Sequence, residues 1–404
     1  MNEEIKERLE QIRRGEVPDG YKRTKAGIIP EEWKAMSLRD IASYSNAHAR
    51  GERNAYVSTE NMGSNYGTVS FSEKMNGPVD GIAYRKENVL IGNIRPYLKK
   101  VWRADRDGVC SADVLVLQHR GVQPLYFYHL IARDEFFCYV MGNSKGSKMP
   151  RGDKNHIMNM PVLIPVSKTE QTTIATILSA QDKIVDLKDR FITEKERQKK
   201  HLMQQLLTGK RRLPGFSGDW KLTKAREVFQ NVTDKNHNGN LEVLSSTQDR
   251  GIIPRSQTDI DIKYDSSALP SYKKVKKGNF IISLRSFQGG IEYSAYEGLV
   301  SPAYTVLENK IPIDAAYYKQ YFKSARYIAQ LQTAVYGIRD GKQISYDDFG
   351  FIEICYPSIQ EQAAIGEVLS AADQEIDLLR ASLEQEKRKK KALSQLLLTG
   401  IVRV

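Results

Sequence analysis

Hydrophobic residues recur at nearly seven-residue intervals in two long, otherwise charged stretches, residues 170–213 and 361–404. A proline precedes each stretch, at Pro165 and Pro357. Because a narrow apolar stripe with this period is typical of coiled-coil helices, we predict one long helix in each stretch. The predicted coiled-coil seam comprises Ile177, Ile184, Leu187 and Phe191 in the first helix and Leu369, Ala372, Ile376, Leu379 and Leu383 in the second.

The two stretches are copies of one another, offset by 191 positions. Aligned without a gap, they share 19 of 44 residues, far more than unrelated helices share, which indicates an internal duplication. Both copies end in Leu-Leu-Thr-Gly, where Gly209 and Gly400 are free to take the left-handed conformation that closes a helix.

A helix of this length with one apolar stripe requires a partner, and the nearest candidate is its own duplicate. Antiparallel pairing of the two copies would form a coiled coil with a pseudo-two-fold axis. The alternative is that each helix packs on its own globular domain, although such a helix usually has a broader apolar face.

The segments outside the helices also repeat, more faintly. The sequence SADVLVL at 111–117 matches SPAYTVL at 301–307, and β-branched runs of this kind, bounded by glycine and asparagine, predict strands within α/β (α+β) domains. We therefore predict five parts. They are an N-terminal helical segment at 1–28, a first globular domain at 29–165, the central helix at 166–213, a second globular domain at 214–357 and the C-terminal helix at 358–404.

The charge balance favours a polyanionic partner. Lys and Arg number 61 against 49 Asp and Glu, a net charge of +12, and nucleic acid is the commonest such partner. A basic protein without such a partner is the alternative. The N-terminus is charged from residue 3 and no apolar run reaches the roughly 18 residues of a membrane helix, so we expect a cytoplasmic protein.

The residues that carry catalysis and metal binding are scattered. Cys110, Cys138 and Cys355 lie far apart among apolar residues, which predicts buried thiols, and the six histidines form no ligand spacing. The sequence has no phosphate-binding glycine loop, no dinucleotide-binding motif and no methyltransferase loop of the Asn/Asp-Pro-Pro-aromatic type. We expect neither catalysis nor a bound metal or cofactor in this chain.

These features together resemble the specificity subunit of type I restriction–modification systems. The features that carry the resemblance are Ile-Pro-x-x-Trp at 29–33, the Glu-Gln start and Leu-Leu-Thr-Gly end of each long helix, and two variable domains of similar length. The duplicated helix is the specific feature, whereas the globular domains match only in layout.

The resemblance implies two target recognition domains, each reading one half of a bipartite double-stranded DNA sequence. It implies that the coiled coil sets the spacing between the halves and docks the methyltransferase (modification) subunits, and that a restriction subunit joins them. S-adenosylmethionine, ATP and Mg²⁺ would then belong to those partners. It also implies a circular organisation, in which the N-terminal segment packs near the C-terminal helix.

DNA recognition requires Lys and Arg for phosphates, and Arg, Asn or Gln for base edges. Arg95 and Arg285 are the strongest candidates, because each follows an apolar strand at an equivalent place in its half. A structural arginine that bonds carbonyl groups is the alternative for that pair, and a solvated surface loop is the alternative for the others. The full set is Arg50, Arg53, Arg95, Tyr97, Lys99, Lys145, Lys148, Arg151 and Lys154 in the first domain and Arg250, Arg255, Arg285, Gln288, Arg339, Lys342 and Gln343 in the second.

Two other functions stay open from the sequence. The chain could be a structural coiled-coil adaptor without DNA specificity, which would show no salt-dependent DNA binding. It could also be a DNA-modifying enzyme with an unrecognised site, which would modify DNA on its own.

Overall fold

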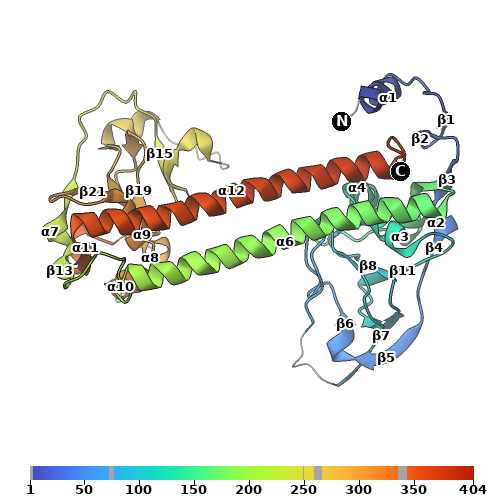
Figure 1. The fold of residues 1–404 in the computed structure, drawn as a ribbon, viewed down its shortest axis with the longest axis horizontal. Helices are drawn as coiled ribbons and strands as arrows, with labels where there is room; N and C mark the ends of the chain where they lie inside the picture. The colour runs from blue at the N-terminus through green and yellow to red at the C-terminus, as the bar shows by residue number, and fades with distance from the viewer. Residues whose placement is uncertain (1–2, 72–76, 249, 259–265, 335–343) are drawn as a thin grey trace. The chain divides into compact units, whose positions relative to one another are not determined.

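The computed structural model describes residues 3–71, 77–248, 250–258, 266–334 and 344–404 (Figure 1). The chain divides into two compact units, each with its own hydrophobic core. Unit 1 comprises Met1–Lys188 with Ser382–Val404, and unit 2 comprises Asp189–Ala381. Both units mix helices and strands, which confirms the predicted α/β class.

A four-stranded antiparallel sheet forms the centre of unit 1, in the order β4-β11-β8-β9. Alternate residues of its strands face opposite sides. Leu115 and Leu117 join the core under the helices, whereas Val114 and Val116 join a second cluster. The elements are β4 (Ala42–Tyr44), β8 (Val89–Gly92), β9 (Val101–Arg103), β11 (Val114–His119), α3 (Pro124–Ile131) and α4 (Asp134–Gly142).

The second cluster lies beneath another four-stranded sheet, β5-β7-β10-β6. Its strands are β5 (His48–Glu52), β6 (Tyr56–Val57), β7 (Pro78–Tyr84) and β10 (Gly108–Cys110). A separate strand pair, β3 (Trp33–Ser37) with β12 (Pro161–Pro165), leads into the first long helix.

Unit 2 repeats this plan. Its central sheet has the matching order β14-β21-β18-β19, and the pair β13-β22 matches β3-β12. The second layer differs, since two separate strand pairs, β15-β16 and β17-β20, stand in place of the four-stranded sheet. The strands are β13 (Lys221–Lys224), β14 (Phe229–Val232), β15 (Leu244–Thr247), β16 (Gly251–Pro254), β17 (Lys273–Val275), β18 (Phe280–Ile282), β19 (Glu292–Tyr293), β20 (Gly298–Val300), β21 (Thr305–Asn309) and β22 (Glu353–Tyr356). The helices include α9 (Ala315–Tyr321), α10 (Ala325–Ala334) and α11 (Tyr346–Phe351).

The N-terminal segment packs against the C-terminal end of the chain within unit 1. It forms helix α1 (Glu3–Arg13) and a hairpin of β1 (Tyr21–Thr24) and β2 (Gly27–Pro30). Arg8 donates a hydrogen bond to the Ile401 carbonyl and Tyr21 donates one to the Gly400 carbonyl, both at 2.8 Å. The predicted packing of the N-terminal segment near the C-terminal helix is therefore confirmed.

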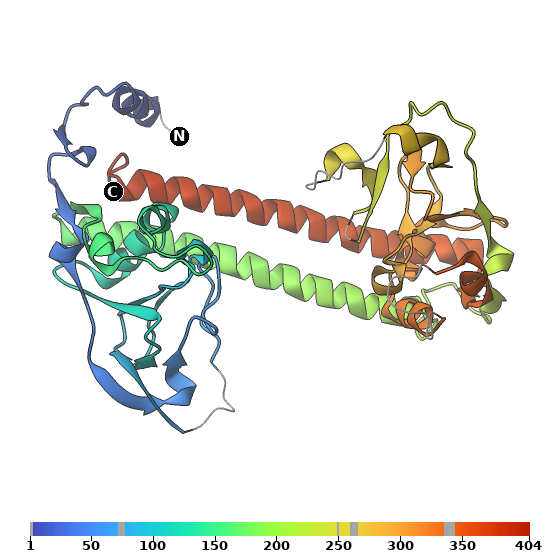
Figure 2. The same cartoon turned by 180° about the vertical axis from the view of Figure 1, so that it is seen from behind.

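The two duplicated stretches form the long helices α6 (Lys168–Leu206) and α12 (Ile359–Leu398), as predicted (Figure 1, Figure 2). The start of α6 pairs with the end of α12 in unit 1, and the reverse holds in unit 2, so the pairing is antiparallel. Buried or half-buried residues recur in a four-three pattern on both helices. They are Ile174, Leu178, Gln181, Val185, Lys188, Ile192, Lys195, Lys199, Leu202 and Leu206 on α6, and Ile365, Leu369, Ala372, Ile376, Leu379, Leu383, Glu386, Lys390, Leu393 and Leu397 on α12.

The predicted seam residues of α12 are buried or half-buried, whereas three of those predicted on α6 are exposed. Ile184, Leu187 and Phe191 lie outside the seam, with 38%, 53% and 48% of each residue exposed. Ile177 is half-buried and packs on the unit 1 core. The adjacent residues Val185, Lys188 and Ile192 hold the seam positions on α6 instead, so these three predictions are each one residue out of phase, and one of the true seam residues is a lysine. Lys188 buries its stem and donates to Ser382 Oγ at 2.6 Å.

One cysteine prediction is also wrong. Cys110 and Cys355 are buried, but Cys138 is exposed. Cys138 lies on α4, whose Phe136, Phe137 and Val140 fill the core, so its own side chain is on the opposite side of that helix.

Candidate nucleic-acid interface

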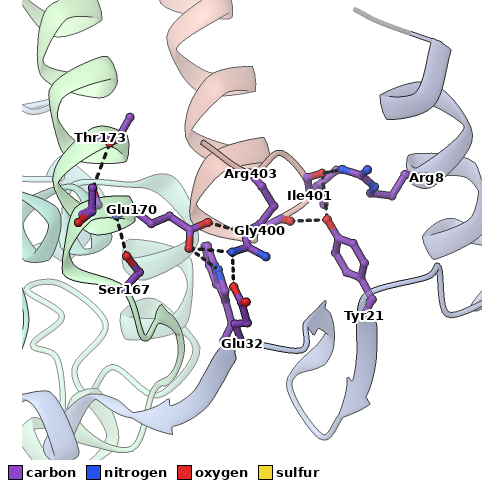
Figure 3. A network of polar contacts seen from close by, with 11 residues as sticks. Arg8, Tyr21, Glu32, Ser167, Glu170, Thr173, Gly400, Ile401 and Arg403 are labelled. Carbon is purple, nitrogen blue, oxygen red and sulfur yellow. Dashed lines mark hydrogen bonds and ion pairs between the residues drawn. The ribbon is translucent and has the colours of Figure 1, made fainter.

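Each globular domain is fixed to the long helices by one buried glutamate. In unit 1, Glu170 lies in the first turn of α6, and only 5% of its side chain is exposed. Its carboxylate accepts hydrogen bonds from Arg403 Nε at 2.5 Å and from Trp33 Nε1 at 3.3 Å (Figure 3). Arg403 also pairs with Glu32 at 2.7 Å. Residues from three distant parts of the sequence therefore meet at one carboxylate.

Unit 2 contains the same arrangement, in which Glu361 and Arg212 are the copies of Glu170 and Arg403 at an offset of 191 positions. Glu361 in the first turn of α12 accepts hydrogen bonds from Arg212 Nε at 2.5 Å, Arg212 Nη2 at 2.6 Å and Trp220 Nε1 at 2.9 Å. Its side chain is 2% exposed. In both units the arginine follows the Leu-Leu-Thr-Gly end of one copy, and the glutamate begins the other copy.

The glutamine after each glutamate joins the helix start to the globular domain. Gln171 accepts a hydrogen bond from the Gln123 backbone at 2.8 Å, at the start of α3. Gln362 accepts one from the Asp314 backbone at 2.9 Å, at the start of α9. The repeated Glu-Gln pair is therefore a structural attachment point in both copies.

A second attachment point lies further along the helices. In unit 1, Asp182 of α6 pairs with Lys390 of α12 at 2.6 Å and lies 3.8 Å from His129 Nδ1 of α3. In unit 2, Asp373 pairs with Lys199 at 2.5 Å and accepts a hydrogen bond from Gln320 of α9 at 2.6 Å. These two sets are also related by 191 positions.

The structure brings two of the predicted DNA-contacting loops of unit 1 together. Arg95 precedes the short helix η2 (Pro96–Leu98), and its amide donates to the Pro150 carbonyl at 2.8 Å. Ile94 and Arg151 form a β-bridge. Arg95 and Tyr97 are exposed, and Arg95 adopts a left-handed conformation at φ 53°. The loop that contains Arg95 is therefore braced by the loop that contains Arg151.

The basic residues of the second loop have different surroundings. Arg151 pairs with Asp113 at 3.0 Å and Lys145 pairs with Asp153 at 3.2 Å, yet 58% and 79% of the two basic side chains stay exposed. Lys148 is exposed, and Lys154 lies over the ring of Tyr44 at 5.8 Å. Exposed pairs of this kind are weak, so these cations are available to phosphates.

Lys99 has a strong internal partner. Its Nζ lies 2.6 Å from Asp134 Oδ1 at the start of α4, and only 30% of its side chain is exposed. The hydrogen bond from Lys99 holds the pKa of Asp134 well below its usual range, with help from Tyr66 and Lys391. This geometry favours a structural role for Lys99 over the predicted contact with DNA.

Arg50 and Arg53 lie apart from these loops in the fold. Arg50 is on β5 of the second sheet and Arg53 begins the short helix η1 (Arg53–Ala55). Both are exposed. The two residues therefore lie on β5 and on the short helix that follows it, and not in the loops around Arg95.

In unit 2, Arg285 occupies the place that corresponds to Arg95. It precedes the short helix α8 (Ser286–Gly289) in the connection from β18 to β19, as Arg95 does between β8 and β9. Arg285 and Gln288 are exposed. Lys323 donates to the carbonyls of Gln248 at 3.2 Å and Gly289 at 2.9 Å, which brings the β15-β16 turn beside α8.

The remaining described candidates of unit 2 also make internal contacts. Arg250 donates to the Gln257 carbonyl at 3.1 Å. Arg255 begins the short helix η3 (Arg255–Gln257) and donates to Ser245 at 3.3 Å. Arg339, Lys342 and Gln343 lie outside the described residues.

The residues of the glutamate attachment points were not predicted as a site. The sequence did contain a signal for them, because Glu170 and Arg403 have identical counterparts in the other copy, Glu361 and Arg212. Within the described ranges, no cluster of three His, Cys, Asp or Glu side chains could hold a metal ion. None of the described helices combines the length and hydrophobicity needed to cross a membrane.

Two curated proteins are similar to the chain along nearly its whole length. The type I restriction enzyme MjaVIII specificity subunit of Methanocaldococcus jannaschii is 23% identical over 419 aligned residues, which cover 93% of this chain and 94% of that protein. The putative type I restriction enzyme MjaX specificity subunit of the same organism is 24% identical over 434, covering 96% and 97%. The resemblance to type I specificity subunits is confirmed.

Two solved structures share the fold of this chain. The S subunit of the type I restriction–modification system from M. genitalium has a TM-score of 0.57 at 14% identity, covering 91% of this chain and 96% of that one. A chain from a structure on complex assembly and conformational transition of the type I system has a TM-score of 0.57 at 18% identity, covering 93% and 99%. No protein-family profile matches the chain.

Proposed function

We propose that this chain is the DNA-recognition subunit of a type I restriction–modification complex. Each α/β unit would read one half of a bipartite double-stranded DNA target, and the paired helices would set the spacing between the halves. The observation that carries the proposal is the contrast between the copies. The attachment points around Glu170 and Glu361 match closely, whereas the exposed loops around Arg95 and Arg285 differ.

That contrast is what two readers of different sequences require. Matching attachment points hold both domains to the helices in a similar way. The short helix after Arg95 and the one after Arg285 have different residues and different backbone conformations, so they present different groups to base edges. A symmetric enzyme would keep the same chemistry in both copies.

Arg95 and Arg285 are the proposed base-reading residues. An arginine can donate two hydrogen bonds to the O6 and N7 atoms of guanine, and both residues are exposed three positions after a buried strand. The exposed cations Lys148 and Lys154 would contact phosphates and position unit 1. The net charge of +12 supports attraction to DNA independent of sequence.

The chain itself would be non-catalytic and would work in the cytoplasm. Methylation and cleavage belong to partner subunits in this proposal. A methyltransferase subunit would carry S-adenosylmethionine, and a restriction subunit would use ATP and Mg²⁺. Both would assemble with this chain.

The decisive experiment is to co-express the chain with its cognate methyltransferase subunit and map methylated adenines across a genome by direct sequencing. A split motif of two short defined blocks around an undefined gap would support a two-domain reader. Methylation by the chain alone would identify an enzyme instead. A stable complex that methylates no sequence would favour a structural adaptor.

A further inference from the structure

The two units differ in charge at one equivalent place. This place is the start of the helix that follows α3 in unit 1 and α9 in unit 2. In unit 1 this helix is α4, and its first residue, Asp134, accepts hydrogen bonds from Lys99 at 2.6 Å and Tyr66 at 2.7 Å. Asp134 also pairs with Lys391 of α12 at 3.2 Å. The last part of α12 is therefore bound to α4 through a carboxylate that belongs to this chain.

A second carboxylate strengthens the same junction. Glu135, the next residue of α4, accepts a hydrogen bond from Gln395 of α12 at 3.3 Å. Two acidic residues at the start of a helix also suit the positive end of the helix dipole. In unit 1 the junction is thus complete without any outside group.

In unit 2 both carboxylates are missing. The helix is α10, and Ala325 and Arg326 stand at the positions of Asp134 and Glu135. The α6 residues that correspond to Lys391 and Gln395 are conserved as Lys200 and Gln204. In the part of the chain that the structure describes, Lys200 is exposed and has no ion-pair partner.

A pocket of about 790 Å³ lies at this junction in unit 2. Four cationic residues line it, Lys200, Lys210, Lys323 and Arg326, and no acidic residue does among the described residues. Of the four, Lys323 is paired, with Glu292. Because α10 begins at the pocket, the positive end of its dipole adds to the excess charge.

We propose that this pocket binds an acidic segment of the methyltransferase subunit, whose carboxylate takes the place that Asp134 fills in unit 1. The inference rests on the proposed function for the identity of the partner. The conserved Lys200 and Gln204 retain the groups that hold the junction in unit 1 and lack their acidic partners. The pocket also has apolar lining from Met203 and Ile328, which suits a protein segment better than a DNA phosphate.

The pocket makes the two units of the duplicated chain unequal. Unit 1 satisfies its junction internally, whereas unit 2 leaves it open for a partner. Unit 2 would therefore make a contact with the methyltransferase subunit that unit 1 does not make.

The test is zero-length crosslinking of the complex of the full chain with its methyltransferase subunit. A water-soluble carbodiimide joins a lysine amine to a contacting carboxylate as an amide and takes up the water that is lost. Mass spectrometry then identifies the joined residues. The expected result is a link from Lys200 or Lys210 to an Asp or Glu of the methyltransferase subunit. The Lys391–Asp134 link within this chain serves as the internal control, because its atoms lie 3.2 Å apart.

A matched pair of variants makes the test independent of crosslinking yield. Ala325→Asp restores the unit 1 carboxylate, so it should remove the Lys200 link to the partner and weaken association about tenfold. Ala329→Asp adds the same charge at an exposed position one turn along α10, outside the pocket lining, and should do neither.

Two results would overturn the inference. One is an intact complex that shows the Lys391–Asp134 link but none from Lys200 or Lys210 to the partner. The other is protection of Lys200 by a DNA duplex in the absence of the methyltransferase subunit, which would assign the pocket to phosphate. If no complex forms at all, the proposed function fails first and the inference fails with it.

Discussion

Glu170 and Arg403, which are 233 positions apart in the sequence, form a charge pair with 2.5 Å between Oε1 and Nε. The carboxylate is almost completely buried, and the arginine is 37% exposed. A buried carboxylate that loses its cation is costly, because no water replaces the lost hydrogen bonds. This pair therefore stabilises the packing of the C-terminal segment against the start of α6.

Arg403→Ala should lower the free energy of unfolding of unit 1 by about 2 kcal/mol, because Glu170 would stay buried without its cation. This expected loss is smaller than the loss for a fully buried ion pair, because Arg403 is partly exposed. Urea unfolding measured by circular dichroism would test this. Arg212→Ala should have a comparable effect in unit 2, where Glu361 is equally buried.

Arg211→Ala is the matched control for Arg212→Ala, since Arg211 is exposed and adjacent. Its effect should stay within about 0.5 kcal/mol. Equal destabilisation by both substitutions would show that the loss of a nearby positive charge, rather than the pair with Glu361, is responsible.

Unit 1 should lose stability as the pH falls from about 6.5 towards about 4. Burial lowers the pKa of His129 from its ordinary value of 6.5 to about 4, against the opposing effect of Asp182. Because the folded pKa is lower than the unfolded one, the folded state binds fewer protons in this range. The contribution of His129 to the free energy of unfolding is therefore fully present above pH 6.5 and is lost as the pH falls. The total loss is about 3 kcal/mol.

His129→Gln is the natural comparison, because Gln320 stands at the equivalent place in unit 2. The variant should remove most of this pH dependence while keeping the fold. Thermal unfolding of both proteins between pH 7 and pH 4.5 would measure the difference. Parallel pH profiles for the two proteins would contradict the assignment to His129.

Arg95→Ala should relax recognition of one half of the DNA target, and Arg285→Ala should relax the other half. Loss of a two-bond contact to guanine costs about 1–3 kcal/mol of discrimination at that base. Methylation mapping of the two variants would show which half changes. Lys148→Ala is the control and should weaken binding to all sequences alike. If Arg95→Ala behaves in the same way, Arg95 contacts phosphate rather than a base.

Insertion of four residues next to Lys188 should change the accepted gap between the two half-targets and leave both half-sequences unchanged. Four residues lengthen a helix by about 6 Å and turn it by about 40°. Insertion of seven residues in each helix, beside Lys188 and Ala381, should preserve more stability, since it keeps the seven-residue seam in phase. A change in the half-sequences themselves would disprove the role of the helices as a spacer.

The duplication and the helices were predictable because they leave periodic and identical residues in the sequence. The phase of the seam was not fully predictable. Seam residues such as Lys188 and Lys195 are charged, and only their ion pairs with Glu386 and Glu375 explain their place. Hydrophobicity alone therefore selected the neighbouring, exposed Leu187.

The candidate interface was predictable only in part. The equivalence of Arg95 and Arg285 follows from the aligned strands before them, and the structure places both before short helices. The structural pairing of Lys99 was not predictable, because Asp134 lies 35 positions away in the sequence. A lysine in a polar loop has the same sequence signature whether it faces DNA or a buried carboxylate.

The attachment of Glu170 to Arg403 and of Glu361 to Arg212 also bears on the origin of the chain. Each pair takes its acid from one copy and its base from the other. In a single-copy ancestor, the glutamate and the arginine would flank one helix, roughly 55 Å apart, and could not meet. Two such polypeptides packed antiparallel would complete each other. The crossed pairs are therefore the expected remains of a homodimer whose gene was duplicated and fused.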